Sequence, residues 1–235
     1  GIYASNNSST SVTIQNSTIA YNQASTGGGI SRPNGTYNIT NTIIANNAAT
    51  FSPDCNGTIA LANFNIIENT VGCSITSGSN NLNVDPQIDS NLTGVMLVHT
   101  LLTGSPAINA GSASGCPPTD QRGVARPQGA ACDIGAYELI PLYTVTFNAN
   151  GGTGSMSNQT QNYNVATALT LNAFTRTGYT FTGWNTAANG SGTAYANGAT
   201  YPFTADATLY AQWSINSYTV TFNANGGTGS MSNQT

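Results

Sequence analysis

Near its N-terminus the chain repeats itself at a fixed spacing of 25 residues. Residues 11–22 read SVTIQNSTIAYN and residues 36–47 read TYNITNTIIANN. A third, weaker copy begins near residue 65, at a spacing of 23 from the second. No window in this region has the apolar spacing of a helix, i, i+3, i+4. Short strands that recur at such a period cannot each bury their own apolar face, so we expect them to stack into a solenoid. The coinciding pairs are Ile14/Ile39, Asn16/Asn41, Ile19/Ile44, Ala20/Ala45 and Asn22/Asn47.

The repeat length fits one coil of a parallel β-structure. At about 3.3 Å per residue, 25 residues form a triangular coil of three short strands and three turns. Equivalent residues of successive coils then lie on top of one another. We therefore expect inward-facing stacks of isoleucine, and asparagine amide ladders at the bends, where asparagine tolerates left-handed backbone. The rival interpretation is an antiparallel sandwich, which does not keep identical residues at a fixed offset. The predicted inward residues are Ile14, Ile19, Ile39, Ile44 and Ile67, and the predicted bends are Asn16/Asn41 and Asn22/Asn47.

A second, longer repeat begins in the other half of the chain. Tyr143–Thr160 returns letter for letter as Tyr218–Thr235, an offset of 75 residues. A period of this length is typical of modules arranged in series. Because the sequence stops inside the second copy, we expect the chain to be part of a longer protein.

The composition excludes several classes of protein. Only 5% of the residues are charged, and four arginines face eight acidic residues with no lysine. Such a chain cannot neutralise a run of phosphates, so no nucleic-acid partner is expected. With 39% hydrophobic residues in regular patterns it is also unlike a disordered segment. No apolar run reaches the roughly 18 residues that span a bilayer, so no membrane span is predicted.

Four cysteines fall into two local pairs, Cys55/Cys73 and Cys116/Cys132. Neither pair has the spacing of a metal site, and the single histidine, His99, has no histidine partner. An even number of cysteines in a chain rich in asparagine and threonine indicates disulfides formed in an oxidising compartment. Free buried thiols are the alternative. No cofactor is predicted.

Residues 40–139 carry a series of specific motifs. They are Asp54-Cys55 with Gly72-Cys73, GSPAINAG at 104–111, TDQRG at 119–123, Arg126-Pro127, and CDIGAYE at 132–138. This region resembles the C-terminal end of bacterial surface β-helix proteins that carry the choice-of-anchor domain. The resemblance implies a right-handed parallel β-helix. Asn109 replaces the aspartate usual in that family, which leaves a charged role at this position in doubt.

Charged residues concentrate at the end of this region. A solenoid needs a cap, since its last coil would otherwise expose unpaired backbone and apolar side chains. We expect arginines and carboxylates here to pair in a folded cap, which Cys116–Cys132 would hold in place. An arginine-lined active site is the functional alternative. The predicted ion-pair residues are Asp120, Arg122, Arg126, Asp133 and Glu138.

After Ile140-Pro141-Leu142 the chain becomes rich in aromatic residues, with twelve in residues 143–217 against six in residues 1–142. The motifs VTFNANGG, GYTFTGWN and LYAQW closely resemble the Listeria–Bacteroides repeat, the B repeat of internalin-type surface proteins, over residues 143–214. The resemblance implies a small β-grasp-like module. Exposed tryptophans that stack on sugars are the alternative role for Trp184 and Trp213. The expected core comprises Phe147, Tyr179, Phe181, Trp184, Tyr210 and Trp213.

Residues that could support catalysis are few. A pectate-lyase-like or polygalacturonase-like enzyme needs clustered carboxylates with an arginine or lysine. The coil region offers Asp85 and Asp89, four residues apart, which could contribute to a calcium site but lack a third carboxylate. His99 is flanked by apolar residues and is expected to be structural. The glycine-rich segment at 150–154 lacks the lysine and helix of a phosphate-binding loop.

These observations predict an all-β protein with four segments. Residues 1–139 would be the last coils and cap of a parallel β-helix, 140–142 a linker, 143–214 a complete B-type repeat, and 218–235 the start of another. We expect an extracellular structural or adhesive role at a bacterial cell surface, without enzymatic activity. The partner would be a host or environmental surface, either protein or glycan. The alternatives are a β-helix polysaccharide enzyme whose active site lies upstream, and a carbohydrate-binding module.

Overall fold

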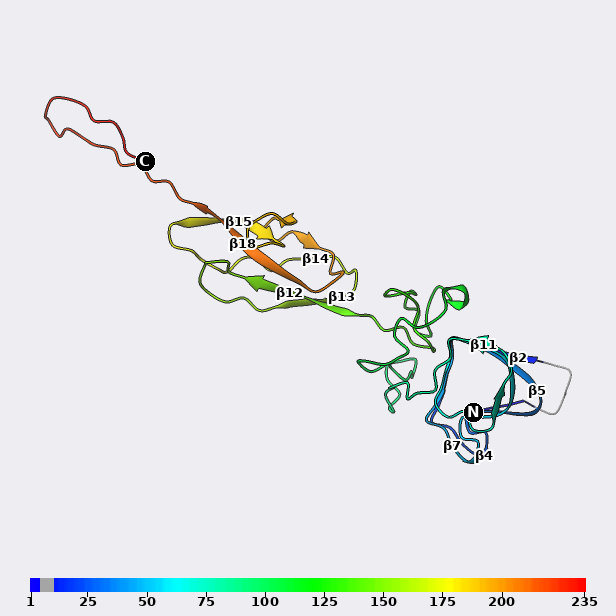
Figure 1. The fold of residues 1–235 in the computed structure, drawn as a ribbon. Coiled ribbons are helices and arrows are strands. Elements are labelled where there is room, and N and C mark those ends of the chain that lie inside the picture. Colours follow the sequence, from blue (N-terminus) through cyan, green and yellow to red (C-terminus); the bar gives the residue numbers. More distant parts are fainter. Residues whose placement is uncertain (5–10) are drawn as a thin grey trace. The chain divides into compact units, whose positions relative to one another are not determined.

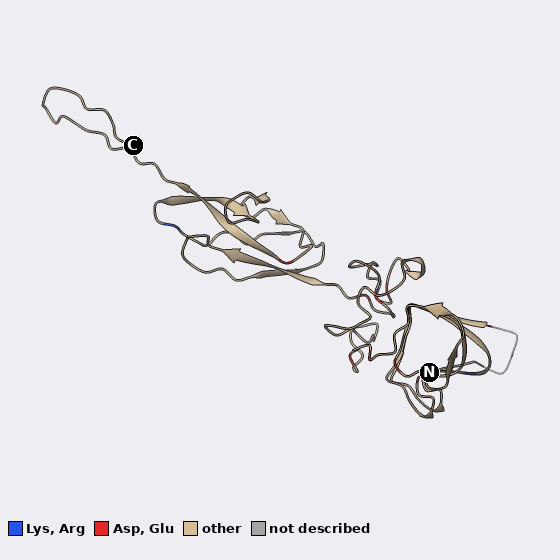
Figure 2. Cartoon of the chain, in the orientation of Figure 1, with Lys and Arg blue, Asp and Glu red and all other residues tan. Residues whose placement is uncertain are grey.

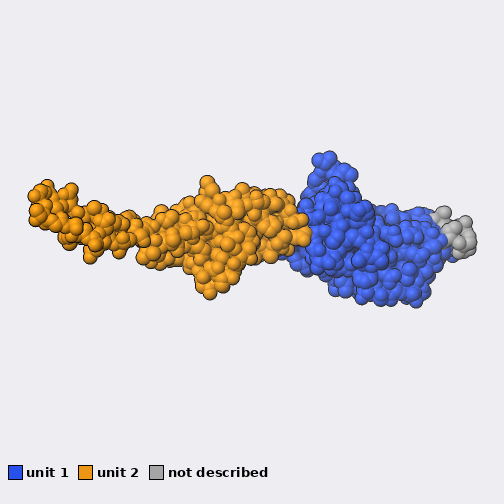
Figure 3. Space-filling view, turned by 90° about the horizontal axis from the view of Figure 1, so that it is seen from above, with its two compact units in different colours: residues 1–141 blue, residues 142–235 orange. Residues whose placement is uncertain are grey.

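A computed structural model describes residues 1–4 and 11–235 (Figure 1). They form two compact units, residues 1–141 (unit 1) and residues 142–235 (unit 2) (Figure 3). Within the described residues, the helical element is a single 3-10 turn, η1 (Ala113–Gly115), so nothing there could cross a membrane as a helix. The protein is all-β, as predicted.

In the described residues of unit 1, eleven strands form three sheets. The first sheet holds six strands, the second has the order β3-β6-β9, and the third pairs β4 with β7. Every pairing between these strands is parallel. The sandwich alternative is therefore wrong for this part of the chain. The strands are β1 (Ile2–Tyr3), β2 (Ser11–Gln15), β3 (Thr18–Ala20), β4 (Gln23–Thr26), β5 (Ile30–Thr40), β6 (Ile43–Ala45), β7 (Ala48–Phe51), β8 (Cys55–Asn63), β9 (Ile66–Ile67), β10 (Cys73–Ile75) and β11 (Gly78–Ser79).

The register follows the sequence repeat. Ile14 lies opposite Ile39 and Ile19 opposite Ile44, both at the offset of 25, while Ile44 lies opposite Ile67 at the offset of 23. All five isoleucines belong to one buried cluster in the interior of the coils. The prediction of stacked inward isoleucines is confirmed. After β9 the offset falls to 16, with Cys73 opposite Gly57, so the last turn is shorter than the others.

Asparagine side chains connect the coils at their bends. Asn16 and Asn41 have positive φ values of 47° and 50°, and Asn41 Nδ2 donates to Asn16 Oδ1 over 3.3 Å. At the next bend Asn22 Nδ2 donates to Asn47 Oδ1 over 2.9 Å, and Asn47 Nδ2 donates to Asp54 Oδ1 over 2.9 Å. The predicted amide ladders are present, and the second ends on a carboxylate.

Residues 83–139, here called the lateral segment, pack against the side of the coils. Ile43 and Ile66 point away from the interior, and the lateral segment covers them with Ile88, Leu101 and Ile134. In Figure 1 the segment accordingly lies beside the ring of coils. Further bonds attach it along the stack: Ala136 N donates to Thr18 Oγ1, Ser112 N to Asn41 Oδ1, and Asn16 Nδ2 to Gly115 O.

This arrangement differs from the predicted cap over the last coil. Strands β10 and β11, which end the stack, remain mostly exposed. The reason lies in β6, whose three residues are all buried. A strand that is apolar on both faces needs a second layer outside the coil, and the lateral segment supplies it.

Unit 2 begins with a five-stranded sheet of order β13-β12-β18-β15-β16. The central strands β12 and β18 are parallel, with Val145 opposite Ala207 and Phe147 opposite Leu209, and the other pairs are antiparallel. The β-grasp-like module expected at 143–214 corresponds to this sheet. Its strands are β12 (Leu142–Asn148), β13 (Gln159–Asn162), β15 (Tyr179–Asn185), β16 (Ala194–Tyr195) and β18 (Ala207–Ile215), and β14 (Thr167–Ala168) pairs separately with β17 (Thr200–Tyr201).

The second copy of the long repeat folds locally in the same register as the first. Val220 bridges Gln234, and the equivalent residues 75 positions earlier, Val145 and Gln159, pair in β12 and β13. The surroundings differ, because Val145 is fully buried whereas Val220 is 53% exposed.

Candidate functional site

Five charged residues near the end of the lateral segment form one largely buried cluster on a chain that is otherwise sparsely charged (Figure 2). They are Asp120, Arg122, Arg126, Asp133 and Glu138. Arg122 Nη2 lies 2.7 Å from Asp120 Oδ2. Arg126 Nη1 lies 3.7 Å from Glu138 Oε2, and both of these side chains are almost wholly buried. The Arg122 guanidinium also stacks on the Tyr137 ring, 3.7 Å from its centroid. Two arginines thus each face one carboxylate.

Asp133 lies in the same cluster, but among the described residues no arginine nitrogen comes within ion-pair distance of its carboxylate, contrary to the prediction. Its carboxylate accepts hydrogen bonds from the backbone N–H groups of Asn109 (2.7 Å) and Leu139 (2.6 Å). Arg126 instead donates to the Asp133 backbone carbonyl over 2.9 Å. Burial raises the pKa of the Asp133 carboxyl to about 6, although the two backbone donors act in the opposite direction.

The other two carboxylates hold backbone in the same way. Asp120 accepts from the backbone N–H groups of Arg122, Val124 and Glu138. Burial opposes its ionisation, but these bonds and the Arg122 side chain outweigh burial and lower the Asp120 pKa. Glu138 accepts from the backbone of Gln128 and Asp133. All three carboxylates thus accept hydrogen bonds from backbone N–H groups of the lateral segment and fix the conformation of its loops.

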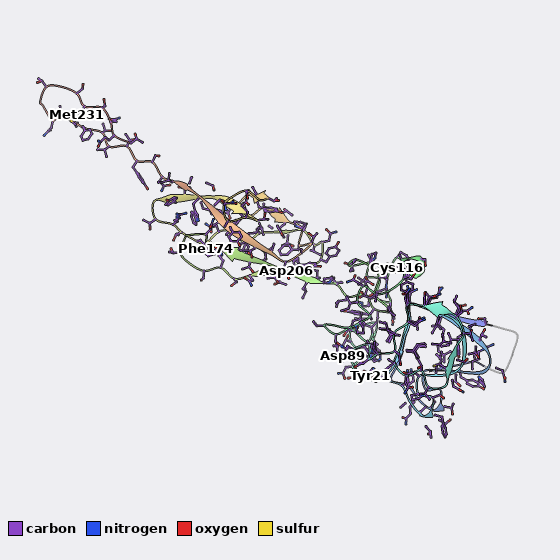
Figure 4. All side chains as sticks on the ribbon, in the orientation of Figure 1. Tyr21, Asp89, Cys116, Phe174, Asp206 and Met231 are labelled. Atoms are coloured by element: carbon purple, nitrogen blue, oxygen red, sulfur yellow. A yellow bond between two sulfur atoms is a disulfide. The ribbon has the colours of Figure 1, made fainter. Side chains whose placement is uncertain are left out.

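The other predicted chemistry-bearing residues lie elsewhere on unit 1. The His99 ring lies against the Tyr21 ring in a tilted arrangement, with centroids 4.9 Å apart, and its Nδ1 lies 2.8 Å from the Asp89 carbonyl oxygen. Figure 4 labels Tyr21 and Asp89 in this part of unit 1. Asp85 and Asp89 each accept a hydrogen bond from the backbone two residues ahead. Over residues 1–4 and 11–235, no three His, Cys, Asp or Glu side chains come together as metal ligands.

Both predicted disulfides are present. Cys55 bonds to Cys73 with their Cα atoms 5.4 Å apart, and Cys116 bonds to Cys132 with a Cα separation of 6.1 Å. These separations lie within the usual range for a disulfide. The first connects the last two turns of the coil stack, and the second closes a loop of the lateral segment. Both fit an oxidising compartment.

The core of unit 2 is built around Trp184, which is 1% exposed. Phe147 and Phe181 lie 4.9 Å and 5.0 Å from it between ring centroids. Phe181 and Trp184 are three apart, yet a bulge between Phe181 and Gly183 turns both toward the core. Trp213 is half-buried against this cluster, and its Nε1 donates to the Ala149 carbonyl over 3.0 Å.

Two predicted core residues differ from expectation. Tyr210 lies on the other face of β18, because Leu209 and Ala211 beside it point inward. Tyr179 is half-buried at the start of β15, with Arg176 3.8 Å above its ring. In the strand LYAQW, side chains alternate between the two faces of the sheet. This alternation could have indicated from the sequence that Leu209, rather than Tyr210, shares the core face with Ala211 and Trp213. The buried residues that we had not singled out are Val145, Leu169, Phe174, Tyr201, Phe203, Leu209 and Ala211.

Comparison with known proteins identifies the aromatic unit. Residues 143–212 match the family model of the Listeria-Bacteroides repeat domain. The match lies wholly within unit 2 and covers less than half of the chain. The match begins at the second residue of β12 and ends within β18. It therefore covers nearly all of the five-stranded sheet and the separate β14–β17 pair.

A relative from Evansella cellulosilytica bears a name that describes it as a Gly-rich membrane protein. It is 59% identical over 51 residues, which is 21% of this chain and 6% of the relative. The chain thus spans only a small part of that protein. No solved structure matches the chain.

Proposed function

We propose that this chain is an extracellular structural and adhesive part of a bacterial cell-surface protein. In this proposal, unit 1 is the end of a right-handed parallel β-helix, and the Listeria-Bacteroides repeats form a stalk that presents it. The observation that carries the proposal is the repeat at residues 143–212 followed by an identical start at 218–235, because serial modules gain reach by repetition.

Other observations support the same location and architecture. The two disulfides of unit 1 are typical of proteins exposed to oxidising surroundings. Parallel strands stacked at offsets of 25 and 23 residues favour a β-helix. The name of the Evansella relative is in line with a protein at the cell envelope.

We propose no catalytic role for the residues described. The carboxylates of the charged cluster accept hydrogen bonds from the backbone of their own loop, and this engagement supports a structural role. A sugar-binding platform of tryptophans is also disfavoured. Trp184 is enclosed by phenylalanine rings, and Trp213 is half-buried against the same cluster, so the two indoles do not form a pair of exposed rings.

Surface labelling of intact cells tests the proposed location. Antibodies against this chain should stain whole cells of the bacterium that carries the gene, and brief external protease treatment should remove the signal. A cytoplasmic protein followed in parallel controls for lysis. Staining that appears only after the cells are broken would overturn the proposal.

A further inference from the structure

The first and last strands of the Listeria-Bacteroides repeat lie side by side. β12 starts at Leu142, where the module begins, and β18 ends at Ile215, where it stops. The two strands are parallel neighbours in the centre of the sheet. The start of β12 and the end of β18 therefore lie at opposite ends of the sheet (Figure 1). Tension applied between Leu142 and Ile215 acts along both strands and slides one past the other.

In this geometry the contacts between β12 and β18 resist the load together. Four residues of β12, from Val145 to Asn148, pair with Ala207 to Tyr210. In sliding, all the backbone hydrogen bonds of this junction must break at once. If the strands were peeled apart from one end, the bonds would break one after another. The same number of bonds therefore resists a much larger force when the strands slide than when they are peeled apart.

Side chains extend the junction at both of its ends. Before the paired residues, Thr144 N donates to Asp206 Oδ1 over 2.8 Å, and Asp206 immediately precedes β18 (Figure 4). Beyond them, Asn150 Nδ2 donates to the Ala211 carbonyl over 2.9 Å, and Trp213 Nε1 donates to the Ala149 carbonyl over 3.0 Å. These three bonds join the β12 side of the junction to the β18 side, so they bear the same load.

The neighbouring strands keep the junction from yielding by rotation or slipping. β18 also pairs antiparallel with β15 at six positions, and β12 pairs with β13 at four. Val145 and Leu209 are fully buried, so sliding exposes apolar core to water. All four cysteines lie in unit 1, which leaves unit 2 to resist tension without a covalent crosslink.

We propose that the Listeria-Bacteroides repeat is a load-bearing module, in which the β12–β18 junction acts as a shear clamp against tension along the chain. The proposal rests on the stalk function above for the source of that tension. The mechanical property itself belongs to the module and can be measured on the isolated chain.

Single-molecule pulling of the full chain in two directions tests the clamp. The native cysteines are all in disulfides, so introduced cysteines provide the attachment points. Leu142→Cys with Ile215→Cys loads the junction in shear, and both positions are exposed, at 64% and 72%. Leu142→Cys with Ala205→Cys is the matched control. Ala205 precedes β18 at the end where β12 starts, so this pair peels the strands apart.

At equal loading rates we expect the shear pair to unfold at a force at least about twofold higher than the peeling pair. Equal forces, or a lower force in shear, would overturn the proposal. Both variants keep the core intact, and tryptophan fluorescence of Trp184 confirms that each is folded. A module that is strong in shear on a protein absent from the cell surface would leave the clamp standing and reject the stalk.

Variants of the flanking bonds locate the load. Asp206→Ala combined with Asn150→Ala removes side-chain bonds at both ends of the junction and should lower the shear force. Asn197→Ala removes a similar bond, from the Asn172 N–H, that lies outside the junction, and should leave the force unchanged. Equal losses in the two variants would contradict a load carried by β12 and β18.

Discussion

At the scale of single residues, unit 1 relies on asparagine where most soluble domains rely on charge. The Asn47 side chain is 8% exposed and makes hydrogen bonds in two directions. It accepts from the backbone and side chain of Asn22 and donates to the carbonyls of Ile19 and Ala45. One amide thus satisfies backbone groups in two successive coils, and the two carbonyls to which it donates are buried.

Replacing Asn47 by alanine should therefore destabilise unit 1 strongly. Several buried groups would lose their partners, so we expect a loss of at least about 2 kcal/mol in unfolding free energy. Urea unfolding followed by circular dichroism measures it. Asn38→Ala is the matched control in the same coil, at a half-buried position between the inward Tyr37 and Ile39, and should change stability by less than about 0.5 kcal/mol. Equal effects would contradict the ladder.

Asp133 should make unit 1 less stable as the pH rises from 4 to 7. Its folded pKa is about 6, above the ordinary value of 3.8, because burial disfavours the charge. The folded state then binds a proton that the unfolded state has lost, so stability falls between these two pKa values by about 3 kcal/mol. Asp120 acts in the opposite sense, since its pKa is lowered and its contribution is lost in acid.

Carbon-detected NMR of the Asp133 carboxyl measures the titration directly. The Asp133→Asn variant removes the group and is the control for assignment. Relative to the parent, the unfolding free energy of this variant should rise as the pH goes from 4 to 7. A parallel pH dependence in the two proteins would contradict the assignment to Asp133.

At the scale of elements, the repeats in the sequence predict the register but not the second layer. Parallel stacking places Ile39 on Ile14, so identical letters at a fixed offset indicate which residues pair. From the sequence alone, Ile43 could not be distinguished from an isoleucine that faces the interior of the coils. The structure shows that β6 is buried on both faces and that Ile43 belongs to the outer one. Three apolar residues in a row, Ile43-Ile44-Ala45, indicate a strand buried on both faces. The residues that cover its outer face lie about 40 to 90 positions later, in an irregular segment whose sequence has no periodicity.

In the candidate site too, some features could be predicted from the sequence and others could not. The local cysteine pairs and the clustering of charges between residues 120 and 138 could be predicted from sequence. The hydrogen bonds of Asp133 to backbone rather than to arginine could not be predicted. Every residue except proline has a backbone N–H group, so the sequence does not indicate which of these groups a carboxylate will bind. In unit 2, the bulge at Gly183 likewise changes which aromatic residues face inward, and no repeat pattern reveals it.

The isoleucine stack should respond to truncation according to its depth. Ile44 is fully buried between neighbours in the preceding and following coils. Ile44→Ala should therefore cost about 2–5 kcal/mol of unfolding free energy. Ile75, 40% exposed in the edge strand β10, provides the control, and Ile75→Ala should cost less than about 0.5 kcal/mol. Urea unfolding of both variants measures the difference, and similar losses would argue against a continuous interior stack.

At the scale of the whole molecule, the two units depend on different sources of stability. Unit 1 combines amide ladders, an isoleucine interior and two disulfides, whereas unit 2 packs rings around Trp184. Both tryptophans belong to unit 2. Their fluorescence therefore follows the unfolding of unit 2 alone.

Reduction of the disulfides should lower the stability of unit 1 without changing that of unit 2. Without its crosslinks, which close loops with sequence separations of 18 and 16 residues, unit 1 should lose about 3 kcal/mol per disulfide. The tryptophan transition of unit 2 should not move. Urea unfolding with and without dithiothreitol, read by circular dichroism and fluorescence, measures both. A double Cys55→Ala/Cys73→Ala variant controls for effects of the reductant, and a shift of the tryptophan transition would contradict independent units.

The identical register of Val145–Gln159 and Val220–Gln234 has a consequence for biogenesis. The opening hairpin of each repeat is specified by nearby residues, so it can form while the rest of the repeat is still being synthesised. The closing strand arrives about 50 residues later and meets interchangeable acceptors in adjacent repeats. Mispairing between neighbours is a known hazard of tandem arrays. Synthesis in an N-to-C direction lets each closing strand find its own hairpin before the next acceptor emerges.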